Sequence, residues 1–218
     1  MRLSHRHVPR AVLMGAFLAF AASQAGCGAS LSKTVPPDLI QRLPKNTRRG
    51  VFQAETVVTI AVDRKANVKR EIDNAEREID RTKEKIREVE KRRAAAPGAE
   101  AEKIDLEIRM YEARIDYLED SLGHLAKRLK LADKELLLAR SQFELEKAKL
   151  VKKHAIAFDT PVEDFEEQVQ EMQAEVDEYR KVVDEDAAEL KQEEEKWLEV
   201  KKAYFSTIGE GTKGWWTE

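Results

Sequence analysis

The chain has 218 residues, of which 37% are charged and only 6% are aromatic, and its formal net charge is −3. The strongly basic surface that nucleic-acid binding requires is therefore absent. Mixed charges combined with regularly spaced aliphatic residues are typical of long helices and coiled coils.

The first 26 residues have the features of a signal peptide. Three arginines and no acidic residue precede an apolar run at residues 11–22. This run is shorter than the roughly 20 residues that a membrane-spanning helix needs. Small residues follow it, as a cleavage region requires. We therefore expect residues 1–26 to be removed on export and to take no part in the fold.

Cys27 is the only cysteine and follows this leader directly. Ala25-Gly26-Cys27 resembles the end of the lipobox of bacterial lipoprotein precursors, although Gln24 stands where that family usually has an apolar residue. The resemblance implies a diacylglycerol and an N-linked acyl chain, such as palmitate, on Cys27, and we expect no other cofactor. The alternative is cleavage by an ordinary signal peptidase after Ala25, which leaves an unmodified thiol.

Residues 27–50 contain Pro36, Pro37 and Pro44 among small polar residues. This composition predicts a flexible tether between the lipid and the folded part. The residue after the cysteine is Gly28 and not aspartate, which in bacterial lipoproteins directs sorting to the outer membrane. The resemblance thus implies an outer-membrane lipoprotein that faces the periplasm. The alternative is a soluble periplasmic or secreted protein.

Three long helices are expected, at about 51–93, 100–157 and 161–205. In each segment apolar residues recur at alternating steps of four and three, which places them on one helix face. Pro97-Gly98 and Pro161 mark the short breaks, so neighbouring helices should be antiparallel. The β-branched run at 57–62 also suits a strand, but a lone strand would leave its backbone groups unpaired. The expected fold is all-α, an elongated antiparallel coiled coil or three-helix bundle.

The apolar stripe of the middle helix widens between residues 129 and 151. Because a two-helix contact needs only a narrow stripe, the widening indicates more than one neighbour, and it leaves self-association of the chain through this stripe open. Residues 63–93 have 12 basic and 9 acidic residues, whereas residues 161–205 have 6 basic and 16 acidic residues. We therefore expect the first and third helices to lie side by side.

Two acidic residues in the apolar pattern of the third helix and two histidines need an interpretation. Asp186 and Glu193 interrupt the apolar pattern of the third helix, which we interpret as imperfect packing near a solvated end. The alternative is that they meet basic groups. His124 and His154 have no metal-ligand spacing and are expected to be exposed helix residues.

Residues 206–218 are expected to form a flexible tail that contains three glycines and the adjacent Trp215 and Trp216. The two tryptophans either fold back onto the bundle, have no role, or dock a partner, since tryptophan is enriched among binding hot spots.

The chain contains no phosphate-binding loop, metalloprotease or hydrolase motif, so we expect no enzyme activity, metal or small-molecule substrate. The predicted function is that of a lipid-anchored periplasmic coiled-coil protein with a structural, spacer or scaffold role in the cell envelope. Its expected partners are the membrane, through the anchor, and other envelope proteins or itself. The alternative is a periplasmic chaperone-like protein that clasps envelope proteins.

Overall fold

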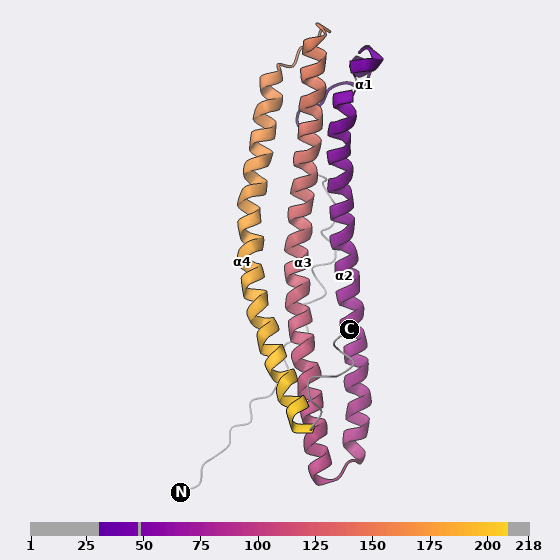
Figure 1. Cartoon of the computed structure of the whole chain (residues 1–218), viewed down its shortest axis with the longest axis vertical. Helices are drawn as coiled ribbons and strands as arrows, with labels where there is room; N and C mark the ends of the chain where they lie inside the picture. The colour runs from indigo at the N-terminus through magenta and orange to yellow at the C-terminus, as the bar shows by residue number, and fades with distance from the viewer. Residues whose placement is uncertain (1–30, 48, 209–218) are drawn as a thin grey trace. The chain divides into compact units, whose positions relative to one another are not determined.

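The computed structural model describes residues 31–47 and 49–208, and these are all-α (Figure 1). A short helix α1 (Pro37–Gln41) and a 3-10 turn (Lys45–Thr47) precede three long helices. These are α2 (Arg49–Ala95), α3 (Gly98–Lys153) and α4 (Val162–Ile208), each of which begins and ends within four residues of the predicted bounds. The predicted fold class is confirmed, and the run at 57–62 lies within α2.

The three long helices form one layer, with α3 in the middle (Figure 1). Both α2 and α4 run antiparallel to α3 and pack against it, but they scarcely contact each other. With 56 residues, α3 is about 84 Å long. The prediction that the first and third helices lie side by side is therefore wrong.

The charge difference between α2 and α4 is balanced through α3 instead. Toward α2, the middle helix offers mainly acidic partners, as in the pairs Arg92–Glu107 and Arg93–Asp105. Toward α4 it offers mainly basic partners, as in the pair Lys134–Glu175. Because α3 offers mainly acidic partners to α2 and mainly basic partners to α4, most of the opposite charges meet on α3, and few contacts join its two neighbours.

Two short turns reverse the chain. Gly98 opens α3 directly after Pro97 and has φ +45°, a left-handed conformation that glycine adopts without strain. At the other end of α3, Ala155 has φ 52°. The backbone N–H of Ile156 donates to the carbonyl of Val151 at 3.2 Å, which closes the helix end before the chain enters α4.

Residues 31–47 differ from the predicted flexible tether, because they pack against the long helices. Val35, Leu39 and Leu43 are between 2% and 7% exposed. Val35 and Leu39 share an apolar cluster with residues of α3 and α4, namely Leu145, Ala148, Val151, Val162 and Phe165. The tether prediction is wrong for this segment, since burial of its aliphatic side chains outweighs the freedom that its composition suggested. We call residues 32–43 the strap.

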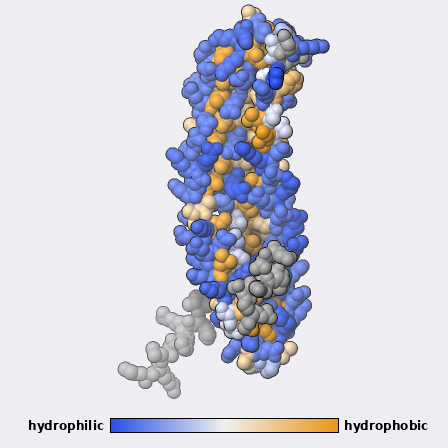
Figure 2. Space-filling view, viewed as in Figure 1, coloured by the Kyte–Doolittle hydropathy of each residue, from blue (hydrophilic) through white to orange (hydrophobic). Residues whose placement is uncertain are grey.

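The strap also accounts for part of the wide apolar stripe of α3. Leu145, Ala148 and Val151 contact it at the α3–α4 turn, and Leu136 and Ala139 contact α2 through Ala61. The prediction of more than one neighbour for this stripe is confirmed for neighbours within the chain, and self-association through the stripe stays a prediction. Apolar side chains reach the surface between the helices on the viewed face (Figure 2).

Candidate functional site: the strap groove and the α3–α4 cleft

The residues singled out from the sequence for lipidation and docking are Cys27, Trp215 and Trp216. All three lie outside the described residues. Lipidation and partner docking therefore stay predictions, and the structure instead draws attention to two polar sites on α3 and α4.

The first site holds the start of the strap between α3 and α4. Gln168 of α4 is only 4% exposed, and its side-chain oxygen accepts hydrogen bonds from the Ser32 hydroxyl and the Lys33 backbone N–H, both at 2.8 Å. Its amide nitrogen donates to the Lys33 carbonyl and to the Ser141 hydroxyl, both at 3.2 Å. One side-chain amide thus bonds the strap backbone in both directions and ties it to α3.

A buried ion pair on α3 continues this site. The backbone N–H of Val35 donates to Glu144 at 2.7 Å, and the ammonium of Lys147 donates to the other oxygen of the same carboxylate at 2.6 Å. Both charged side chains are 11% exposed. Charge-assisted hydrogen bonds of this kind are stronger than neutral ones, so they fix the strap at a defined height along α3.

The strap contacts were not found from the sequence. Glu144 and Lys147 look like an ordinary i,i+3 pair on a charged helix, and Gln168 looks like one of many polar residues of α4. The only signal was that these two charged residues fall inside the wide apolar stripe of α3, where a charge needs a partner when it is buried.

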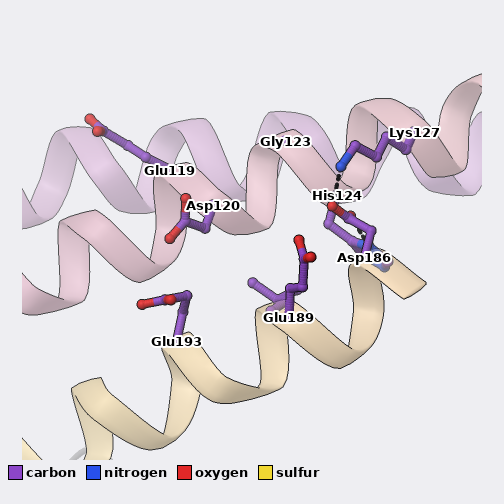
Figure 3. Close-up of a pocket in the computed structure, with 9 residues that line it drawn as sticks. Glu119, Asp120, Gly123, His124, Lys127, Asp186, Glu189 and Glu193 are labelled. Atoms are coloured by element: carbon purple, nitrogen blue, oxygen red, sulfur yellow. Dashed lines mark hydrogen bonds and ion pairs between the residues drawn. The ribbon is translucent and has the colours of Figure 1, made fainter. Parts of the chain in front are cut away.

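The second site is a cleft of about 270 Å³ between α3 and α4. Figure 3 shows His124 and Lys127 of α3 converging on Asp186 of α4. His124 Nδ1 lies 2.7 Å from one oxygen of Asp186, and Lys127 pairs with the other. The acidic residue at this position therefore meets basic groups, so its interpretation as imperfect packing is wrong.

Burial and the neighbouring basic groups have opposite effects on the pKa of Asp186. Burial raises the pKa of Asp186, but the hydrogen bonds from Lys127 and His124 outweigh it, and the pKa is lowered overall. On the other side of the pair, the hydrogen bond to Asp186 raises the pKa of Lys127. With 12% of its side chain exposed, His124 is not the exposed helix residue that was expected.

The remaining acidic residues of the cleft lie along its walls. Glu119 and Asp120 extend from α3, and Glu189 and Glu193 extend from α4 (Figure 3). Glu193 pairs with Lys196 of its own helix at 2.6 Å. Within residues 31–47 and 49–208, no three His, Cys, Asp or Glu side chains are grouped so that they could hold a metal ion. The arrangement supports a structural role, in which the contacts of His124 and Lys127 with Asp186 hold α3 and α4 together.

The comparisons with known proteins add no family. Neither a protein family, nor a curated protein, nor a solved structure matches the chain. In the part of the chain that the structure describes, no helix combines the length and the apolar character needed to cross a membrane.

Proposed function

We propose that the chain is a lipid-anchored coiled-coil protein of the periplasm, with a spacer or scaffold role in the cell envelope. The signal-peptide features of residues 1–26 and the lipobox-like end at Cys27 favour anchoring. Gly28 favours the outer membrane through the same resemblance. The acyl chains hold the protein to the bilayer, and the helices supply the length.

The observation that carries this proposal is the attachment of the strap. A spacer can hold a partner at a set distance only if the link between its anchor and its rigid part is short. Ser32 and Lys33 are hydrogen-bonded to Gln168, and Val35 is hydrogen-bonded to Glu144. Only four residues separate Cys27 from Ser32, so the anchor is joined closely to helices that are up to 56 residues long.

The proposed partners are other envelope proteins. Trp215 and Trp216 supply the docking group, because tryptophan buries a large area and donates one hydrogen bond. They follow α4, whose last described residue is Ile208. The docking residues are therefore separated in sequence by the whole helical layer from the lipid at Cys27.

The anchoring part is tested by mass spectrometry of the mature protein purified from envelopes. We expect a chain that begins at Cys27 and carries the mass of a diacylglycerol and one further acyl chain. In a Cys27→Ser variant the leader should stay uncleaved or the protein should move to the soluble fraction. An unmodified wild-type chain that begins at Gly26 would refute the anchor.

The scaffold part is tested by crosslinking in whole envelopes followed by purification. A defined set of envelope proteins should crosslink to the wild-type chain and be lost when Trp215 and Trp216 are both replaced by alanine. The melting temperature of the variant should not change. If the crosslinked set is the same in both proteins, the tryptophans do not dock a partner.

A further inference from the structure

The amino-terminal part of α2 has an outward apolar face that the long helices leave uncovered. Phe52 is 61% exposed, Ile60 is 47% exposed and Val57 is 46% exposed. Phe52, Thr56 and Ile60 are four residues apart, so they follow one face of the helix. Phe52 is the most exposed large apolar side chain of the described residues. We call Phe52 and Ile60, together with Val57 at the edge toward α3, the α2 face.

The α2 face lies at the same height along α3 as the start of the strap. Val57 lines a groove together with Gln142 of α3. The neighbouring residue, Ser141, accepts the hydrogen bond from Gln168, which also holds Ser32. The point at which the chain leaves for Cys27 is therefore level with the exposed part of α2.

The number of residues between Cys27 and Ser32 limits how far the lipid can lie from the start of the strap. The five residue steps from Cys27 to Ser32 span at most about 18 Å when fully extended. The twelve residue steps of α3 from Ser141 to its end at Lys153 span about the same distance. An anchor that leaves the helices at this height reaches beyond the end of α3 only if it is fully stretched. This length favours a bilayer beside the helices near the α3–α4 turn over one beyond the end of α3.

The charged residues that precede the α2 face are basic, which also suits a phospholipid surface, whereas Glu55 and Asp63 are acidic residues of α2 within and after it. The first turn of α2 has no acidic residue, and Lys45 and Arg49 lie just before Phe52. Basic side chains beside apolar ones are the pattern of segments that rest in the headgroup region, with the apolar groups entering roughly 5–10 Å. We propose that the α2 face contacts the bilayer that holds the Cys27 lipid, an inference that rests on the proposed anchoring.

The test uses the acylated full-length mature protein on vesicles of phosphatidylethanolamine and phosphatidylglycerol that contain a nitroxide-labelled lipid. Because acylation blocks Cys27, a Thr56→Cys variant takes one environment-sensitive fluorophore on the α2 face. An Ala188→Cys variant places the same fluorophore on an exposed position of α4. We expect the lipid nitroxide to quench the label at position 56 and to leave the label at position 188 bright.

Matched substitutions test the side chains themselves. Phe52→Ser combined with Ile60→Ser should abolish quenching at position 56 while the protein still floats with the vesicles. Val182→Ser, at an equally apolar α4 position that is 41% exposed, should leave the quenching intact. Circular dichroism checks that both variants keep their helices.

The outcomes separate the contact from the anchor. Protein that carries no acyl mass and does not float refutes the anchoring, and the contact with it. Floating protein whose label at position 56 is no more quenched than that at 188 refutes the contact alone. A label at position 56 that is shielded from aqueous iodide but not quenched by the lipid nitroxide would overturn the proposal in favour of self-association through the α2 face.

Discussion

Ala155 is a residue whose backbone conformation does not suit its side chain. Its φ of 52° lies in the left-handed region. There the contact between the Cβ and the following carbonyl costs a residue other than glycine about 1–2 kcal/mol. The conformation is needed because it lets the chain turn from the end of α3 toward α4 while Ile156 bonds to Val151. The backbone of Ala155 is therefore strained, and the strain is a consequence of the turn between α3 and α4.

Ala155→Gly should stabilise the protein by about 0.5–1 kcal/mol, because relief of this strain exceeds the entropy that glycine adds to the unfolded chain. The matched control is Ala157→Gly, two residues further along the same turn, where φ is negative. There we expect a loss of about 0.4–1 kcal/mol. Urea unfolding measures both values, and equal losses in the two variants would contradict the strain at Ala155.

Asp186 gives stability that depends on pH. Its pKa in the folded protein is lowered from the ordinary value of 3.8, so its contribution is fully present above about pH 4. The contribution is lost as the pH falls through the folded-state pKa. The stabilising partners are His124 and Lys127, which lie on α3 opposite the carboxylate.

Asp186→Asn should therefore cost about 1–3 kcal/mol at pH 7, since it leaves His124 and Lys127 without their anion. The difference from wild type should shrink as the pH is lowered below 4 in urea unfolding experiments. Glu189→Gln, at an exposed position of the same cleft, should change stability by no more than about 0.5 kcal/mol. A loss for Asp186→Asn that stays constant down to pH 2 would contradict the ion pair.

At the scale of the elements, α3 contains two ion pairs of the same composition in different surroundings. Glu144–Lys147 and Glu146–Lys149 have the same residue types and the same i,i+3 spacing. The first pair has 11% of each side chain exposed, whereas the second pair has 45% and 46% exposed. We expect the buried pair to contribute more, because it is desolvated, its N–O distance is 2.6 Å against 3.6 Å, and Glu144 also accepts the Val35 N–H.

Glu144→Gln should destabilise the protein by about 3 kcal/mol, because it leaves the ammonium of Lys147 buried without a counter-charge. Glu146→Gln should cost less than about 0.5 kcal/mol, as is usual for exposed pairs. Hydrogen exchange should also show faster exchange at Val35 in the first variant, since its N–H bonds to Glu144. Similar stability losses in the two variants would show that burial does not set the energy of the pair.

The long helices could be predicted from the sequence, whereas the strap could not. Helix bounds follow from the four-three period and from local breaks such as Pro97-Gly98, which need no knowledge of distant residues. The strap has too few apolar residues to show a period, and its prolines suggest a tether. Its partners Glu144 and Gln168 are 109 and 135 residues away from Val35 and Lys33. Only tertiary packing brings these groups together.

At the scale of the whole layer, α3 joins two helices that scarcely touch. Glu135 illustrates this role, because it pairs with Arg180 of α4 at 3.1 Å and lies 3.9 Å from Arg64 of α2. In a closed three-helix bundle each helix would contact both others, and loss of one would expose the remaining core. In this layer α2 and α4 pack mainly on α3, and they share with it the apolar cluster that contains Val89 of α2 and Phe205 of α4.

This arrangement predicts that α2 and α4 can open separately. Ile79 is a buried residue of α2 and Val176 a buried residue of α4, with 6% and 0% exposed. A buried aspartate at either position is strongly unfavourable. By hydrogen exchange with mass spectrometry, Ile79→Asp should raise exchange throughout α2 while α4 stays protected, and Val176→Asp should do the reverse. Val182→Asp, at an exposed position of α4, should change neither helix. If Ile79→Asp and Val176→Asp each released both outer helices equally, the layer would unfold as one unit and α3 would not separate its neighbours.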